Sequence, residues 1–454
     1  MEKPLHVGLV SLHTNPIAQP GQGDAGGMNV YIHQLAQQLA AQGTQIEIFT
    51  RATDPDGPAT KLMPDGETDI SSTSLATDNR QTSLPKTVAP VTVAPNIRLW
   101  KIPAGPNDLL KGDLVGIIPE FVANAHAVIA HQLEQPLDLL HSHYWLSGIA
   151  GLELAAQSQV PLVHSMHTTA QVKNAHLAPG DTPEPEHRLL GETQIIQNAD
   201  LLMASAHHEK QALIERYKAD PNKIQVVYPG VSTAIFHPNH TPSVEERSAE
   251  SNRRHVSKLR LNLGISPDTK LVVFAGRVQK LKAPDILIKA LPLLPDEVQL
   301  AIVGGPSGDP AIIPQLENLA TELGVADRVQ FVGPVAPETL ANWYRAADVV
   351  AVPSYNETFG LVAAEALACG TPVVAANVGG LREIVQDGET GTLVPSYEPQ
   401  DWAKALNDII EHPHHRAWLA QNAAAQSGLF TWAQTAAQTL DGYQKAIQGA
   451  GRRS

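Results

Sequence analysis

The stretch GQGDAGG, directly before a segment of helical periodicity, contains the residue types of a phosphate-binding loop. Gly21, Gly23 and Gly26 match the G-x-G-x-x-G pattern of dinucleotide sites. In such sites the glycines follow the first strand at once, and an acidic residue ends the second strand. Here HTNPIAQP separates the expected strand from Gly21, and Glu47 lies inside the second strand. An NAD site is therefore the less favoured interpretation.

Gly26 and Gly27 are suited to binding an anion even if the loop does not bind NAD. Without side chains, they let a ligand approach the backbone closely at the start of the helix. The free N–H groups and the dipole of a helix N-terminus favour a negative charge. The alternative is a loop that needs glycine only for its flexibility.

Two glutamates lie eight positions apart in YNETFGLVAAEALACGTP, the segment with the strongest signal. If a helix starts near Phe359, Glu365 lies inside it and Glu357 precedes its N-terminus. These carboxylates could accept hydrogen bonds from sugar or ribose hydroxyls, beside backbone N–H donors of TFGL. The alternative is a glutamate that only offsets the helix dipole, together with a solvated helix residue.

Arg277 and Lys282 follow an apolar strand in FAGRVQKLKAP. Two cations at a strand end can hold a diphosphate and stabilise the charge that develops on a leaving group. Ordinary surface cations are the alternative, which the position after a buried strand disfavours.

Two series of strands and helices must position these residues. The first begins with an apolar strand, a loop, a helix that Gly43 ends, and a second strand, which is a β-loop-α-β unit. A Thr-, Asp-, Pro- and Ser-rich stretch at 53–96 is expected to be a flexible surface excursion. The expected strands of this series are 5–12, 45–51, 97–103, 136–145, 161–167, 199–205 and 223–230.

A polar stretch at 237–258 is expected to link this series to a second one. The strands of the second series are expected at 270–277, 298–305, 328–333, 347–354, 372–377 and 391–395, and a terminal helix at 432–448. The predicted fold class is α/β, with two doubly wound Rossmann-like domains facing a cleft. We expect the domains at 1–236 and 237–431, with 432–454 packing back toward the first domain.

Bulk composition limits the function classes. A chain of 454 residues is too long for one ordinary core, and its net charge of −14 argues against binding of nucleic acid or an anionic membrane surface. The single cysteine, Cys369, excludes an intramolecular disulfide framework and fits a reducing compartment. The N-terminus lacks a signal pattern, and no run of about 18 apolar residues is found. A cytoplasmic protein is expected.

The three motifs together resemble the GT-B, family-4 retaining glycosyltransferases, whose pattern is G-G in the first loop, G-R-x4-K, and E-x7-E before G-T-P. The resemblance spans nearly the whole chain. Four stretches, among them LLHSHYWLSG and HTTAQVKNAHLAPGDTPEPEHR, are similar to the members of mycothiol biosynthesis. The resemblance implies transfer of N-acetylglucosamine from UDP-GlcNAc to 1D-myo-inositol 3-phosphate. It also implies that no catalytic metal is required, and we keep a homodimer as an expectation.

The matching motifs also imply site residues. Catalytic roles would belong to Arg277, Lys282, His167 and Glu357. The donor would contact Gln19, Pro20, Asp24, Ala25, Gly26, Gly27, Met28, Asn29, Arg277, Lys282, Val335, Glu357 and Glu365. The acceptor would contact His13, Asn29, Lys111, Tyr144, Thr168 and Arg188, in which cations and hydroxyls suit a phosphomonoester.

The resemblance further implies a structural Mg²⁺ near Tyr344, Arg345, Ala347 and Thr371, held through carbonyl and hydroxyl oxygens. A zinc site at His141, His143 and His164 is disfavoured, because strand residues alternate faces and no carboxylate stands at ligand spacing. One departure from the family is Ala283, which stands where the pattern has glycine and predicts a stiffer loop.

The implied chemistry is front-face displacement at the anomeric carbon, since no carboxylate is obviously placed as a covalent nucleophile. The alternatives are another family-4 transferase such as a sucrose-phosphate synthase, a GT-B sugar-nucleotide epimerase, and a non-catalytic nucleotide-sugar sensor.

Overall fold

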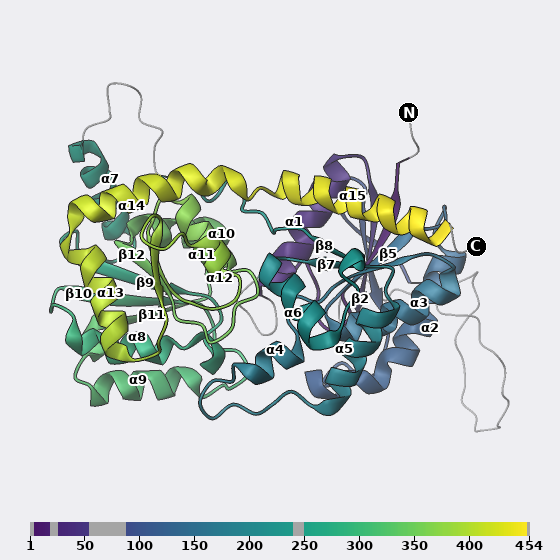
Figure 1. Ribbon diagram of the computed structural model, residues 1–454, viewed down its shortest axis with the longest axis horizontal. Helices are drawn as coiled ribbons and strands as arrows, with labels where there is room; N and C mark the ends of the chain where they lie inside the picture. The colour runs from purple at the N-terminus through teal and green to yellow at the C-terminus, as the bar shows by residue number, and fades with distance from the viewer. Residues whose placement is uncertain (1–3, 19–25, 54–87, 239–248, 452–454) are drawn as a thin grey trace, which may run out of the picture.

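Two mostly parallel sheets, each covered by helices, form two lobes that lie side by side (Figure 1). The computed structural model describes residues 4–18, 26–53, 88–238 and 249–451. The expected class, two Rossmann-like α/β domains, is confirmed.

The N-terminal sheet has the strand order β3-β4-β2-β1-β5-β6-β7-β8, in which only β3 is antiparallel to its neighbour. Its strands are β1 (His6–Val10), β2 (Gln45–Arg51), β3 (Val91–Ala94), β4 (Ile97–Ile102), β5 (Leu139–His143), β6 (Leu162–Ser165), β7 (Leu201–Ala204) and β8 (Ile224–Val226). Its helices are α1 (Gly27–Ala41), α2 (Ile118–His131), α3 (Trp145–Ser158), α4 (Ala170–Ala175), α5 (Glu186–Asn198) and α6 (His207–Tyr217), with short 3-10 turns η2 (Lys111–Ile117) and η3 (Pro221–Lys223).

The C-terminal sheet is wholly parallel, in the order β11-β10-β9-β12-β13-β14. Its strands are β9 (Lys270–Ala275), β10 (Val298–Val303), β11 (Val329–Gly333), β12 (Val349–Val352), β13 (Val373–Ala376) and β14 (Gly391–Val394). Its helices are α7 (Ala249–Asn262), α8 (Pro284–Ala290), α9 (Ile312–Glu322), α10 (Pro337–Ala346), α11 (Leu361–Ala368), α12 (Leu381–Ile384), α13 (Pro399–Glu411) and α14 (Pro413–Gln426), and α15 (Trp432–Gly451) ends the chain.

The central strands of both sheets are buried on both faces, which is why they are near-continuous apolar runs. Every residue of β1, β5, β12 and β13 is buried. Helices therefore have to cover each face, and the crossovers carry every strand except β3 back in the same direction. The loops after β1, β5 and β6 consequently meet at one edge of the sheet, where open α/β sheets bind ligands.

The chain crosses between the lobes twice, and the two crossings lie against each other. The Val231 N–H donates to the Phe430 carbonyl (3.0 Å), and a side chain at Gly230 would lie 2.1 Å from the Trp432 nitrogen. After the second crossing, α15 packs on α1 of the N-terminal lobe (Figure 1). There the Tyr443 hydroxyl lies 2.8 Å from His141 Nδ1.

One expectation for the excursion at 53–96 is wrong. Residues 91–94 form strand β3, paired antiparallel with β4, because alternating Val-Thr-Val suits an edge strand and Asn96 turns the chain at φ 62°. The segment 54–87 lies outside the described residues.

The segment Lys111–His131 is the one described helical stretch that is long and apolar enough to cross a membrane. Phe121, Val122 and Ala125 of α2 are buried in the N-terminal core, and 33% of the apolar window is buried in all. Helix α2 therefore packs one face against the core.

Candidate active site

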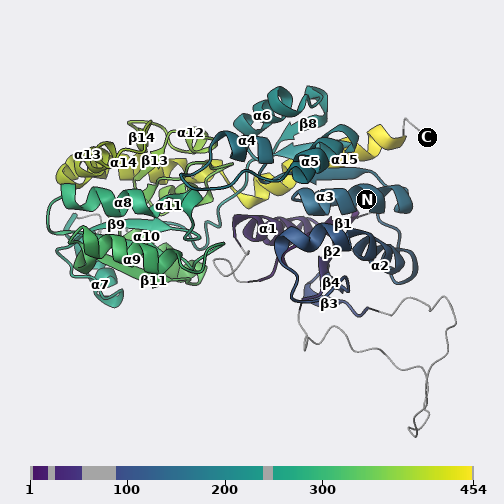
Figure 2. The ribbon, with the colours of Figure 1, turned by 90° about the horizontal axis from the view of Figure 1, so that it is seen from below.

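A cavity of about 710 Å³ lies between the lobes and is lined from both of them. Figure 2, seen from below, shows α1 at the boundary that the cavity occupies. The residues predicted from sequence that line it are Gly26, Gly27, Met28, Lys111, Tyr144, His167, Thr168, Arg188, Arg277, Lys282, Val335, Glu357 and Glu365. His13 and Asn29 lie outside its lining, and Gln19, Pro20, Asp24 and Ala25 fall outside the described residues.

The N-terminus of α1 faces Arg277 of the other lobe. A side chain at Gly26 would lie 3.0 Å from Arg277 Nε, and one at Gly27 would lie 3.3 Å from Leu361. Arg277 and Leu361 of the opposite lobe thus occupy the space where side chains at Gly26 and Gly27 would lie. This places the Arg277 guanidinium at the N-terminus of α1. An anion bound here would meet the dipole of α1 and the Arg277 charge together.

Asn29 holds the loop after β1 against the start of α1. Its Oδ1 accepts from the Gly26 N–H (3.1 Å), and its Nδ2 donates to Thr14 Oγ1 (2.9 Å) and to the Asn15 carbonyl (2.7 Å). All three contacts are internal, so the side chain positions the loop. The predicted direct contact with substrates stays a prediction.

The Glu47 carboxylate is hydrogen-bonded to other side chains of the N-terminal sheet. It accepts from Arg98 Nε (2.9 Å) and Trp100 Nε1 (2.6 Å), and lies 3.0 Å from His6 Nε2. Burial raises the pKa of Glu47, but these hydrogen bonds outweigh it and the pKa is lowered. A carboxylate so occupied has no oxygen to offer a nucleotide ribose, which removes the acidic partner of an NAD site.

Lys282 and Glu357 form an ion pair across the donor side of the cavity. Glu357 also accepts from Ser354 Oγ (3.2 Å) and precedes α11, and Glu365 lies within this helix, as expected. The pair places a cation and a carboxylate side by side at the cavity wall. Lys282 is suited to a phosphate, and Glu357 to a neighbouring sugar hydroxyl.

Glu365 differs from Glu357 in its surroundings. Burial raises the pKa of Glu365 to about 8, against a hydrogen bond from the Tyr344 hydroxyl (3.2 Å). The folded protein therefore retains a proton that the unfolded chain loses above pH 4.5, its ordinary pKa.

Glu365→Gln tests this protonation. As pH rises from 4.5 to about 8, the unfolded state binds fewer protons than the folded state, so wild type loses stability relative to the variant. The slope is at most about 1.4 kcal/mol per pH unit. Urea unfolding across this window measures it, with the exposed Glu317→Gln of α9 as control. A difference that does not change with pH would show an ionised Glu365.

Tyr144 lies between two cations on the acceptor side. Lys111 Nζ lies 4.9 Å and the Arg188 guanidinium carbon 5.0 Å from the centre of its ring, and the ring of His13 lies 4.4 Å away. Burial, and then the positive charges of Lys111 and Arg188, lower the pKa of His13, so the imidazole beside Tyr144 is neutral. The structure thus gathers four of the predicted acceptor residues.

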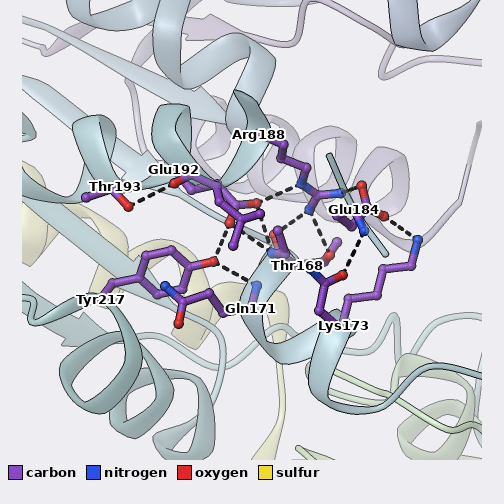
Figure 3. A network of polar contacts seen from close by, with 11 residues as sticks. Thr168, Gln171, Lys173, Glu184, Arg188, Glu192, Thr193 and Tyr217 are labelled. Carbon is purple, nitrogen blue, oxygen red and sulfur yellow. Dashed lines mark hydrogen bonds and ion pairs between the residues drawn. The ribbon is translucent and has the colours of Figure 1, made fainter. Parts of the chain in front are cut away.

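Arg188 is buried, with 3% of its surface exposed, and each of its three guanidinium nitrogens has a partner (Figure 3). Its Nε donates to Glu192 (2.8 Å), Nη2 to the Thr168 carbonyl (3.2 Å) and hydroxyl (3.3 Å), and Nη1 pairs with Glu184 (2.9 Å). Its counter-ions hold the guanidinium at the cavity wall, where it can meet an anion.

His167 touches the opposite lobe through its backbone. Its carbonyl accepts from the Thr358 hydroxyl (2.7 Å), next to Glu357, and its Nε2 lies 3.0 Å from His143 Nδ1. Burial lowers the pKa of His167 to about 3, so the imidazole is neutral and can donate or accept a hydrogen bond without a charge.

Two residues that line the cavity have strained backbones. Tyr144 (φ 73°) and His167 (φ 58°) have positive φ angles, which bulky residues rarely adopt. Ala283, beside Lys282, has φ 52°, which explains the glycine of the family pattern there. The backbone beside Lys282 is therefore strained, and the stiffer loop stays a prediction.

The candidate zinc histidines make hydrogen bonds within the sheet. His141 lies 2.9 Å from Ser165 Oγ and His164 2.8 Å from Ser142 Oγ. Within the described residues, no group of three or more His, Cys, Asp or Glu side chains is placed to hold a metal ion.

The residues suggested for a structural Mg²⁺ lie in and after helix α10 and before strand β13. The Tyr344 carbonyl accepts from the Thr371 hydroxyl (2.7 Å) and the Ala347 N–H (3.1 Å), while Arg345 contributes a cation. Mg²⁺ binds oxygen ligands, usually with a carboxylate among them, and this set contains none. These residues would have to hold an ion through carbonyl and hydroxyl oxygens alone, and the magnesium site stays a prediction.

Sequence reasoning missed Lys173, Glu184, Glu192 and Thr358. The first three surround Arg188, and Thr358 links the lobes. Glu184 and Glu192 stand four residues before and after Arg188, a spacing that predicts helix ion pairs and could have found them.

Comparison with known proteins agrees with this geometry. Residues 26–230 match the family model described as "Glycosyl transferase 4-like domain", and residues 256–426 match "Glycosyl transferases group 1". A D-inositol 3-phosphate glycosyltransferase of Xylanimonas cellulosilytica is 46% identical over 443 residues, 97% of each chain. The chain belongs to the family-4 glycosyltransferases.

Solved structures show the same GT-B fold for this glycosyltransferase. Sucrose-phosphate synthase from Thermosynechococcus elongatus superposes with a TM-score of 0.81 at 32% identity, covering 97% of this chain and 98% of that one. Anabaena HepE, solved in complex with UDP-glucose, has a TM-score of 0.69 at 22% identity, covering 96% and 98%, and supports the fold alone.

Proposed function

We propose that this glycosyltransferase moves N-acetylglucosamine from UDP-GlcNAc to 1D-myo-inositol 3-phosphate with retention at the anomeric carbon, the first step of mycothiol biosynthesis. The observation that carries the proposal is one cavity with two groups of cations. Arg277 and Lys282 suit the donor diphosphate, and Lys111 and Arg188 suit the acceptor phosphate. The curated relatives carry the name D-inositol 3-phosphate glycosyltransferase, which supports this acceptor.

In the proposed reaction an acceptor hydroxyl oxygen bonds to the anomeric carbon while the bond from that carbon to the diphosphate oxygen breaks. UDP leaves with the electron pair, and the hydroxyl proton passes to the departing β-phosphate. Attack from the leaving-group face gives retention. Arg277, Lys282 and the α1 N-terminus would stabilise the developing charge. Glu357 is already paired with Lys282, which favours a role in holding the sugar over one as a covalent nucleophile.

Cytoplasmic location and assembly as a homodimer belong to the same proposal. The buried free thiol of Cys369 is consistent with a reducing compartment. Closure of the lobes over both substrates is also proposed, supported by the contact of Thr358 with the His167 carbonyl across the cavity.

A second candidate is sucrose-phosphate synthesis, favoured by the 32% identity to the Thermosynechococcus enzyme. It would use the same diphosphate side with a hexose phosphate as acceptor. The sugar-nucleotide epimerase and the non-catalytic sensor remain alternatives without a specific observation in their favour.

Release of UDP, measured with each acceptor in turn, tests the function. We expect release with UDP-GlcNAc only when inositol 3-phosphate is present, and NMR of the product should show the donor's anomeric configuration. Release only with a hexose phosphate would favour the second candidate. Sugar inversion without an acceptor would indicate an epimerase, and binding without turnover a sensor.

A further inference from the structure

Glu184 occupies a position at the cavity wall that an anionic ligand could take. Its carboxylate lies between two cations that line the same cavity, pairing with Arg188 Nη1 (2.9 Å) and with Lys173 Nζ (Figure 3). Glu184 itself lines the cavity. Two cations that converge on one carboxylate at a ligand cavity form a ready-made anion site.

Arg188 has a second carboxylate partner of a different kind. Glu192 is fully buried and also accepts from the Ala170 N–H (2.8 Å) and the Tyr217 hydroxyl. These donors hold it in place behind Arg188. Arg188 would thus keep a buried counter-ion even without Glu184.

Glu184, in contrast, can leave by rotating its side chain alone. Its side chain is 15% exposed, and its backbone N–H donates to Asn174 Oδ1 (2.7 Å). Burial raises its pKa, but the opposing charges of Arg188 and Lys173 outweigh it, so the group is ionised at neutral pH. Glu184 is thus the carboxylate that Arg188 and Lys173 share at the cavity wall.

We propose that Glu184 is a displaceable stand-in for the acceptor's phosphate. The incoming phosphate replaces the carboxylate on Arg188 Nη1 and Lys173 Nζ, so Lys173 becomes a further phosphate-binding residue. This inference rests on the proposed function in requiring a phosphorylated acceptor. It also explains selectivity, because a neutral polyol cannot compete with the carboxylate for two cations, whereas a dianion can.

Glu184→Gln keeps the size of the side chain and removes the competing charge. We expect the variant to bind inorganic phosphate and inositol 3-phosphate about fivefold more tightly, because the ligand no longer displaces an ion pair. Its affinity for unphosphorylated myo-inositol and for UDP should not change. Lys173→Met should weaken both phosphate ligands by about fivefold or more. Isothermal titration calorimetry measures all four ligands.

Glu186→Gln is the matched control, since Glu186 is an exposed glutamate at the start of α5 that does not line the cavity. Unchanged or weaker phosphate binding by Glu184→Gln would overturn the inference and make Glu184 a fixed support for Arg188. Equal gains for phosphate and for myo-inositol would overturn it as well. Inorganic phosphate separates this inference from the proposed function. If wild type ignores inositol 3-phosphate but phosphate affinity still rises in Glu184→Gln, the function fails and the displaceable carboxylate stands.

Discussion

Alanine in place of Arg277 or Lys282 is expected to lower kcat by about a hundred- to thousandfold, while the protein stays folded. Both side chains line the donor side of the cavity from the segment between β9 and α8, and Arg277 reaches the N-terminus of α1 on the other lobe. Their charges would be used most when the diphosphate departs, so the loss should fall on turnover more than on acceptor affinity. Steady-state kinetics with both substrates varied measures this.

The two substitutions are not equivalent. Lys282→Ala also leaves Glu357 without its ion-pair partner, whereas Arg277→Ala leaves that pair intact. Arg277→Ala is therefore the cleaner test of charge stabilisation. Lys280→Ala is the control, because Lys280 is an exposed cation two residues from Lys282 and outside the cavity lining. Near-normal turnover in Arg277→Ala would contradict the proposed charge sink.

Replacement of Arg188 by alanine should abolish most acceptor binding and also destabilise the protein. Loss of a charge-assisted contact to phosphate would weaken the acceptor by about ten- to a hundredfold. The variant also leaves Glu192 buried without its cation, at a cost of about 3–5 kcal/mol. Calorimetry with inositol 3-phosphate and with UDP, together with thermal unfolding, measures the two effects.

Lys111→Met separates the two consequences. Lys111 is exposed at the start of η2, and its Nζ lies 4.9 Å from the centre of the Tyr144 ring. Its substitution should weaken the acceptor with a smaller change in Tm than Arg188→Ala, because the Lys111 side chain is exposed whereas Arg188 is buried. UDP affinity should hold in both variants. Weakened UDP binding in parallel with the acceptor would place Arg188 on the donor side and contradict the assignment.

The order of the elements could be predicted because it depends on local patterns. Apolar runs such as those of β1 and β12 are buried on both faces, and that burial requires the covering helices that the periodicity indicates. Strand β3 was missed, since an edge strand of four residues in a polar stretch has too little apolar pattern to stand out.

The candidate site was predictable as far as residue types at strand ends allow. Arg277, Lys282 and Glu357 come from neighbouring loops of one domain, so their common location follows from the parallel sheet. Asn29 illustrates the limit. Its motif position predicts a substrate contact, but its amide is used by Thr14, Asn15 and Gly26.

The sequence by itself thus determined the two α/β units, the strand ends that carry the cations and carboxylates, and the family. Only the tertiary structure decided which charges far apart in the sequence lie together. Lys282 pairs with Glu357, and Arg277 reaches Gly26 across the lobes. These contacts depend on how the lobes and loops pack and on how deeply each charge is buried. Coulomb energy depends on distance and surrounding dielectric, and neither can be read from positions along a chain.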